Sequence, residues 1–411
     1  MTTDDRMHVA VVVTRFVAGA GGVALRGALA LDQDRFRVTI LSAPGGRLLE
    51  EAAAADLEVV LLDHMSPEIS PARDRRAVRE LTNYFERNRT DVVHTHSAKA
   101  GAIGRIAASR SAVPAIIHTF HGFPFHNFQS RARRTAYISA ERWLGRKTDE
   151  FLAIGDSVAA EAIRLGIASP DRVRVVASAI ENSITPASPE SRARSRTTLG
   201  VGEDVLLVGT VGRLDFQKAP LDMIRAVAAL ERDDVHLVWV GGGPLMDEAQ
   251  KLIDNIGLGH RVALLGERDD VPQLLPGLDV FAMSSLYEGI PCAVIEAMSC
   301  GIPIVATAVN GVPDVVKHGR TGLLARPGDP RSLARAIELT FDDPHNAQAM
   351  AKAARLGVIG DFDPGLLGKS LDDSYTRTLR RKTPQRISSH SSSPAAADII
   401  SLEPARLPRS L

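Results

Sequence analysis

The stretch VLLVGTVGRLDFQKAP (205–220) decides the fold class. Its first eight residues are almost entirely apolar, without the polar alternation typical of a strand that has one solvated face. A loop with Arg213 and Lys218 follows, and Pro220 is placed to open a helix. Because strands of this kind are covered on both faces by crossover helices, the stretch predicts one unit of a parallel α/β sheet.

The same pattern recurs along the chain and predicts two doubly wound parallel-sheet domains. The runs expected to be strands are 8–13, 37–41, 58–62, 91–96, 115–120 and 149–154, then 205–212, 235–242, 262–266, 279–284 and 303–307. The predicted division is a first domain at 1–182, a Ser-, Pro- and Arg-rich linker at 183–199, a second domain at 200–365, a helix at 366–381 and a disordered tail at 382–411.

Composition narrows the class of protein. The 411 residues exceed what one core ordinarily organises, and Lys plus Arg and Asp plus Glu both number 49, which argues against a nucleic-acid-binding protein. Cys292 and Cys300 would lie roughly 12 Å apart on one helix, too far for a disulfide. Sparse unpaired cysteine, an N-terminus without a signal-peptide pattern and the lack of an 18-residue apolar run predict a cytoplasmic protein.

The loop after the first strand contains Gly19-x-Gly21-x-x-Ala24, which superficially fits a dinucleotide fingerprint. Five residues (14–18) separate it from the strand, and the second predicted strand ends in Ser42 rather than an acid, so we do not expect a nicotinamide site. Glycines that open a helix still let the backbone approach an anion. A tight turn without a ligand is the alternative.

The loops of the second half carry more chemistry. Arg213 and Lys218 lie five residues apart before a helix, and a glycine turn occupies 241–244. In open α/β sheets such loops meet at the carboxyl ends of the strands, where two cations and a helix N-terminus suit a diphosphate. The alternative is a pair of solvated loop cations.

The segment YEGIPCAVIEAM (287–298) holds two glutamates around an apolar run. Pro291 fits the start of a helix, which places Glu288 in the loop before it and Glu296 about a turn and a half inside it. Two carboxylates that accept hydrogen bonds from hydroxyls, with free backbone amides between them, suit a sugar nucleotide. The alternative is that Glu296 is merely exposed where the helix dipole favours an acid.

Together these motifs resemble the family-4 retaining glycosyltransferases, whose signature is this pair of glutamates with seven residues between them. The matching segments are 66–78, 91–108, 113–125 and 153–158, then 212–220, 240–244, 266–285, 287–307 and 309–329. The resemblance runs from about residue 8 to 380 and is nearest to the branch that builds bacterial exopolysaccharide and capsule. It implies the GT-B fold, in which two Rossmann-like domains face a cleft and a C-terminal helix crosses back to the first domain. It further implies sugar transfer from a nucleotide-diphosphate sugar, UDP-linked, to a lipid-linked saccharide.

The resemblance also implies roles for individual residues. Arg213 and Lys218 hold the donor diphosphate, and Glu296 binds the ribose hydroxyls. Glu288, with the amides of Gly289 and Ile290, contacts the donor sugar, and the loop around Arg268 holds the base. From the first domain, Gly21 and Gly22 close over the phosphate and His121 lies beside the reacting carbon. The predicted catalytic residues are therefore His121, Glu288, Arg213 and Lys218. The predicted donor-binding residues are Gly21, Gly22, Gly212, Arg213, Lys218, Gly242, Arg268, Glu288, Gly289, Ile290, Pro291 and Glu296.

The chain departs from the family pattern at Ala177-Ser178-Ala179, where Pro-Asn-Gly is usual, which puts the hinge or cleft wall there in doubt. Two Asp-x-Asp patterns, 32–34 and 361–363, are interpreted as surface turns, so no metal and no other cofactor is expected. A nucleotide-sugar epimerase of the same fold and a non-catalytic glycosyltransferase-like partner are the competing interpretations.

A basic segment predicts contact with a membrane. Ten Lys or Arg against two acids lie between Arg89 and Lys147, and aromatic residues in GFPFHNFQ (122–129) precede a basic helix. Aromatic and cationic residues together suit the surface of an anionic bilayer, so we expect residues 123–147 to place the protein peripherally at the inner face of the plasma membrane. The alternative is a solvated basic face whose aromatic residues pack inside.

Overall fold

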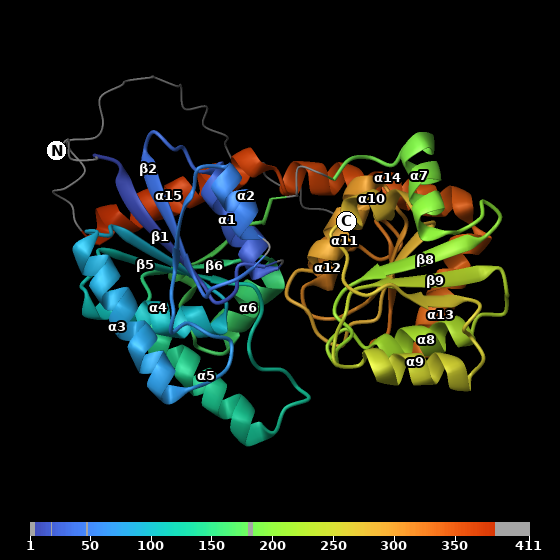
Figure 1. The fold of residues 1–411 in the computed structure, drawn as a ribbon, viewed down its shortest axis with the longest axis horizontal. Helices are drawn as coiled ribbons and strands as arrows, with labels where there is room; N and C mark the ends of the chain where they lie inside the picture. The colour runs from blue at the N-terminus through green and yellow to red at the C-terminus, as the bar shows by residue number, and fades with distance from the viewer. Residues whose placement is uncertain (1–4, 18, 47, 180–183, 383–411) are drawn as a thin grey trace, which may run out of the picture.

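The computed structural model describes residues 5–17, 19–46, 48–179 and 184–382, and these form two α/β domains side by side (Figure 1). The first domain contains a seven-stranded sheet in the order β3-β2-β1-β4-β5-β6-β7, and the second a six-stranded sheet in the order β10-β9-β8-β11-β12-β13. All strand pairs of both sheets are parallel. Each order reverses direction after its first three strands, between β1 and β4 in the first sheet and between β8 and β11 in the second, as in doubly wound folds.

The strands of the first domain are β1 Met7–Val13, β2 Phe36–Ser42, β3 Glu58–Leu61, β4 Val92–His96, β5 Ala115–Phe120, β6 Glu150–Ala153 and β7 Val173–Val175. Those of the second are β8 Leu206–Val211, β9 Val235–Val240, β10 Val262–Leu264, β11 Val280–Met283, β12 Ile304–Thr307 and β13 Leu323–Ala325. Each predicted strand is present. Among the described strands, the edge strands β7 and β13 were not predicted, because three residues are too few to give a periodic signal.

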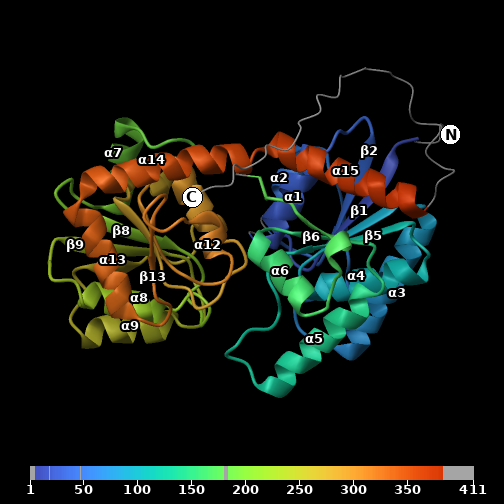
Figure 2. The ribbon, with the colours of Figure 1, turned by 180° about the vertical axis from the view of Figure 1, so that it is seen from behind.

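Helices cover both faces of each sheet (Figures 1 and 2). In the first domain they are α1 Ala20–Ala30, α2 Leu48–Ala54, α3 Pro71–Arg87, α4 Ala98–Arg110, α5 Arg131–Gly145 and α6 Asp156–Arg164. Those that follow are α7 Pro189–Leu199, α8 Pro220–Ala228, α9 Met246–Asn255, α10 Val271–Leu274, α11 Cys292–Cys300, α12 Val312–Val315, α13 Pro330–Asp342, α14 Pro344–Asp361 and α15 Pro364–Lys382. Short 3₁₀ turns occupy 170–172 and 275–277.

The predicted linker at 183–199 is wrong over most of its length, because residues 189–199 form α7. Ser188 caps this helix reciprocally with Ser191, and Gly200 ends it in the left-handed conformation. Arg196 is buried and bonds the carbonyl oxygen of Gly277 at 3.1 Å and Asp279 at 3.2 Å. The Ser- and Arg-rich composition suggested a loop, whereas its arginine anchors α7 on the second domain.

Helices α14 and α15 connect the domains (Figures 1 and 2). Helix α14 packs against α11 and α13 of the second domain, and α15 packs against α1 of the first. The side chains of Leu367, Leu371, Tyr375 and Leu379 belong to the first domain's core. The chain therefore returns to its first domain in a helix that begins at Pro364, two residues before the predicted start. The residues of the predicted tail that follow Lys382 lie outside the described part of the chain.

Candidate active site

A cleft of about 590 Å³ opens where the carboxyl ends of the two sheets face each other. Its lining comes mainly from the segment after β5, one residue of α5, helix α6, and the loops after β8 and β11. Of the predicted site residues, His121, Glu288 and Gly289 line it. This is the edge at which ligands bind in open α/β sheets, and the topology brings these three residues to it.

The backbones of the two domains lie close together at Gly289. A Cβ atom at this position would lie 1.8 Å from the carbonyl oxygen of His121, and one at Gly311 would lie 2.0 Å from the carbonyl oxygen of Gly289. No side chain fits between these backbones. Gly289 therefore lets the loop of the second domain touch the segment that carries His121.

Glu288 is fixed by a ring of polar partners. Its carboxylate accepts from Lys218 Nζ at 2.6 Å, from Ser285 Oγ at 2.7 Å and from Gln217 Nε2 at 3.3 Å. Its backbone N–H donates to Asn310 Oδ1 at 3.2 Å. The predicted cation and the predicted sugar-binding carboxylate thus form one ion pair.

The remaining basic residues of the predicted site pair within their own loops. Arg213 lies 2.6 Å from Asp215 and its side chain is 72% exposed, and Arg268 pairs with Asp270. Gly212 is packed under the stem of Lys218, and Gly242 lies against the side chain of Glu267. The side chains of Arg213 and Lys218 therefore pair with different carboxylates, although the backbone N–H of Lys218 also donates to Asp215 at 3.1 Å.

On the first domain, Gly21 and Gly22 lie in the first turn of α1. A Cβ atom at Gly21 would lie 2.9 Å from the carbonyl oxygen of Arg15, and the guanidinium of Arg26 packs over Gly22. The charge of Arg26 contributes to a lowered pKa of His121, after burial as the main cause. This first-domain cation was not among the predicted site residues, because a lone arginine on a helix gives no sequence signal.

The predicted residues of the last loop lie at the start of α11. Pro291 is the residue before its first turn, and Glu296 is half-buried in the second turn. The side chain of Ile290 is buried against the first domain, where a Cβ atom at Gly155 would lie 2.6 Å from its Cδ1. Besides the amide expected to face the donor, Ile290 therefore contributes an apolar contact between the domains.

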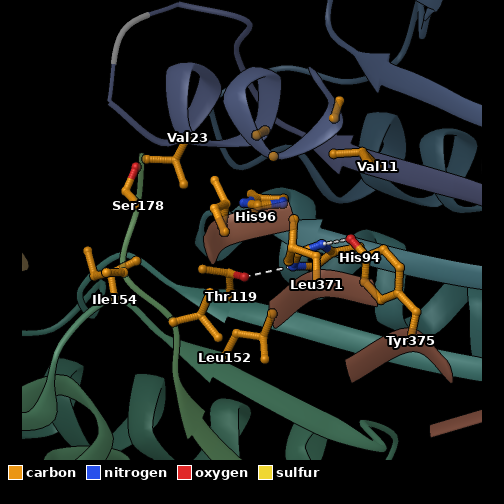
Figure 3. Close-up of a pocket in the computed structure, with 16 residues that line it drawn as sticks. Val11, Val23, His94, His96, Thr119, Leu152, Ile154, Ser178, Leu371 and Tyr375 are labelled. Carbon is orange, nitrogen blue, oxygen red and sulfur yellow. Dashed lines mark hydrogen bonds between the residues drawn. The ribbon is translucent and has the colours of Figure 1, made fainter. Parts of the chain in front are cut away.

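His121 continues a chain of imidazoles whose buried members His94 and His96 are drawn in Figure 3. His121 Nε2 lies 2.9 Å from His96 Nδ1, and the rings of His96 and His94 are 4.2 Å apart. His94 in turn bonds Thr119 Oγ1 and the hydroxyl of Tyr375 on α15, both at 2.7 Å. The pair on β4 is thus packed, and it connects the cleft residue His121 to the crossover helix.

Burial keeps these imidazoles neutral. It lowers the pKa of His94 to about 3 and that of His121 to about 4, and it holds the pKa of His96 and of His118 well below the usual value. At neutral pH, His121 is therefore an uncharged ring that can donate or accept one hydrogen bond but is a weak base.

The departure from the family pattern lies beside this chain. Ala177 and Ser178 line a cavity of about 20 Å³ together with His94, His96 and Tyr375 (Figure 3). They face α1 and α15 and are not part of the 590 Å³ cleft. The altered segment therefore forms the wall of an internal cavity of the first domain.

Comparison with known proteins identifies the family. Residues 17–183 match the model described as Glycosyltransferase Family 4, and residues 191–357 match the one described as Glycosyl transferases group 1. A D-inositol 3-phosphate glycosyltransferase of Mycobacterium marinum is 30% identical over 331 residues, which are 72% of this chain and 70% of that one. The protein belongs to glycosyltransferase family 4.

Two further similarities extend over nearly the whole family-4 transferase. The UDP-Gal:alpha-D-GlcNAc-diphosphoundecaprenol alpha-1,3-galactosyltransferase of Escherichia coli is 27% identical over 369 residues, 88% of this chain and 95% of that one. The crystal structure of Anabaena HepE in complex with UDP and glucose superposes with a TM-score of 0.78 at 21% identity, covering 90% of this chain and all of the other. That superposition supports the GT-B fold.

Two contacts between the domains of this family-4 glycosyltransferase were not predicted from the sequence. Asp314 Oδ2 accepts from the backbone N–H of Ser157 at 2.8 Å and from its hydroxyl at 2.7 Å. The rings of His126 and Tyr287 stack with centroids 4.3 Å apart. Each pair joins one residue from either domain, and such pairs cannot be matched from spacing along a chain.

The two Asp-x-Asp patterns of the transferase are turns, as expected. Asp32 Oδ1 accepts from the backbone N–H of Asp34 at 2.9 Å, and Asp363 Oδ1 accepts from that of Leu366 at 3.0 Å. Within the described ranges, no three His, Cys, Asp or Glu residues are arranged to hold a metal ion.

The predicted membrane face of the transferase needs correction. Phe125 is buried, and only Phe128 and Trp143 among its large aromatic side chains are exposed, by 55% and 48%. Arg105, counted in the basic excess, is buried 2.9 Å from Glu141, which removes one cation and one acid from the surface. No helix in the described part of the chain is both long and apolar enough to cross a bilayer. The exposed cations of α5 are Arg131, Arg133 and Arg142, with Arg146 directly after it.

Proposed function

We propose that this protein transfers a sugar, with retention at the anomeric carbon, from a UDP-sugar to a saccharide that is linked to a lipid, in the synthesis of cell-surface polysaccharide. The observation that carries the proposal is the meeting of Glu288, paired with Lys218, and His121 in one cleft between the two sheets. The E. coli relative, named for a UDP-Gal donor and a diphosphoundecaprenol-linked acceptor, supports both substrate classes.

In this proposal the donor lies on the second domain. Lys218 exchanges Glu288 for the diphosphate, and Arg213 and the N-terminus of α11 add positive potential as charge builds on the departing nucleotide. The freed Glu288 accepts from hydroxyls of the donor sugar beside the amides of Gly289 and Ile290. Glu296 binds the ribose, and the loop around Arg268 binds the base.

The first domain completes the reaction centre. Gly21 and Gly22 close over the phosphate, and Arg26 is a further cation on that side. His121, neutral because of its low pKa, orients a hydroxyl beside the reacting carbon and does not act as a strong base. Charge stabilisation comes from side chains and helix termini in this scheme, with no metal or cofactor required.

The acceptor enters from the first-domain side, where the exposed cations of α5 contact anionic lipid. In this proposal the protein binds peripherally at the inner face of the membrane through these cations.

The direct test is to incubate the purified full chain with individual UDP-sugars and a sugar-diphosphate-lipid acceptor and to measure UDP release and product. Acceptor-dependent release with an α-linked product from an α-linked donor supports the proposal. A changed nucleotide sugar in the absence of acceptor would instead identify an epimerase, and no turnover with any donor would identify a non-catalytic partner.

A further inference from the structure

The first-domain wall of the cleft carries a cluster of three charged side chains: Arg134 on α5 and Glu161 and Arg164 on α6. Arg164 holds Glu161 with two hydrogen bonds, from Nε at 2.7 Å and from Nη2 at 2.6 Å. Arg134 approaches the same carboxylate only to 3.9 Å. Glu161 is thus hydrogen-bonded to Arg164 and is only a longer, 3.9 Å ion-pair partner of Arg134.

One donor of the Arg134 guanidinium, Nε, has no hydrogen-bond acceptor among the described residues. Its Nε is shielded from solvent and has no partner among the described residues, and its side chain as a whole is only 31% exposed. Phe125, itself buried, lies under it with the guanidinium carbon 5.9 Å from the ring centroid. A guanidinium that is partly desolvated and has one buried donor without an acceptor is costly, and an anion bound to it in the cleft would offset that cost.

We propose that Arg134 binds a phosphate group of the acceptor, so that the acceptor is a saccharide joined through phosphate to its lipid. The proposal rests on the proposed function and deepens it. The same cleft contains Glu288 and His121, where the acceptor hydroxyl would react. The phosphate and the reacting hydroxyl would therefore occupy one continuous space.

Two features separate this site from the donor site. Arg134 belongs to the first domain, whereas the predicted diphosphate ligands Arg213 and Lys218 belong to the second. Beside the cleft, Phe128 and Phe216 are 55% and 52% exposed with their rings 5.4 Å apart. An apolar chain attached to the phosphate would find these rings where it leaves the cleft.

The test uses the full chain with UDP at saturation, which fills the donor site, and measures binding of geranyl diphosphate by calorimetry, with geraniol as the neutral control. We expect the wild type to bind geranyl diphosphate and to bind geraniol at least tenfold more weakly. Arg134→Gln should weaken geranyl diphosphate about ten- to a hundredfold, as expected for a lost charge-assisted hydrogen bond. Arg134→Lys should lose less.

Arg87, an exposed arginine of α3, supplies the matched control, and Arg87→Gln should bind geranyl diphosphate as the wild type does. Glu161→Gln should tighten binding, because it removes a carboxylate beside the phosphate, and misfolding cannot mimic such a gain. The proposal would be overturned if Arg134→Gln bound geranyl diphosphate as tightly as the wild type, or if Arg134→Gln and Arg87→Gln lost binding equally. It would also be overturned if the wild type did not bind geranyl diphosphate. UDP binding is measured separately. A protein that does not bind UDP would count against the proposed function and not against this site.

Discussion

Lys218 and Glu288 form a 2.6 Å ion pair between two loops at the carboxyl edge of the second sheet. The pair is poorly exposed, at 22% and 6% of the respective side chains. It neutralises the two groups in the absence of substrate and would have to open when a diphosphate and a sugar arrive. Most of the donor chemistry is therefore expected to depend on this pair.

Replacing Lys218 with alanine should lower kcat/KM for the donor about ten- to a hundredfold, since a charge-assisted contact is worth about 1.5–3 kcal/mol. Glu296→Ala should cause a loss of similar size. The control is Lys251→Ala, which removes an exposed lysine of α9. Near-normal steady-state kinetics in both Lys218→Ala and Glu296→Ala would show that the site is misassigned.

The buried imidazoles predict a stability that falls in mild acid. The pKa of His94 is lowered to about 3 and that of His121 to about 4, against about 6.5 in an unfolded chain. Below pH 6.5 the unfolded chain therefore takes up protons that the folded chain does not. For each such ring, the free energy of unfolding should fall by about 1.4 kcal/mol per pH unit as the pH drops from about 6.5 towards 4. Above pH 6.5 the stabilisation from each neutral buried ring is fully present.

Urea unfolding between pH 7.5 and 4.5 measures this slope. His94→Gln should flatten it by the share of one ring, while replacement of the exposed His345 should leave it as in the wild type. An unchanged slope in His94→Gln would mean that this ring is protonated in the folded protein.

Helix α15 should be needed for stability and the segment after it should not. Leu371→Ala removes a side chain that is 4% exposed and should lower the free energy of unfolding by about 2–5 kcal/mol. Leu366→Ala, on the same helix but 52% exposed, is the matched control and should change it by less than about 0.5 kcal/mol. Truncation after Lys382 should leave the thermal midpoint and transfer unchanged, whereas a lower midpoint would show that the tail packs on the protein.

Co-sedimentation tests the membrane surface. The full chain should pellet with anionic vesicles at low salt and remain in solution at high salt, because each cation near anionic lipid contributes about 1 kcal/mol that salt screens. Changing Arg131, Arg133, Arg142 and Arg146 together to glutamine should abolish pelleting. The same change at the exposed Arg73, Arg75, Arg76 and Arg79 of α3 should not. Equal loss in both variants would indicate attraction by net charge rather than a docking face.

The strands and the loops after them were predictable because both carry local signals: continuous apolar runs, glycine turns and helix starts. The partners of the site residues were not. That Lys218 pairs with Glu288, or Asp314 with Ser157, depends on loops brought together from distant parts of the chain. The linker prediction was wrong for another reason. The burial of Arg196 depends on the Gly277 carbonyl and the Asp279 carboxylate, which lie about 80 residues further along the chain.

The return of α15 to the first domain has a consequence for how the protein is made. The side chains of Leu367, Leu371, Tyr375 and Leu379 complete a core that otherwise comes from the first 180 residues. While the ribosome is still producing the second domain, the apolar face of α1 that receives them stays open. The first domain is thus synthesised first but completes its core last. A nascent chain should therefore need chaperones to shield this apolar face until α15 has left the ribosome.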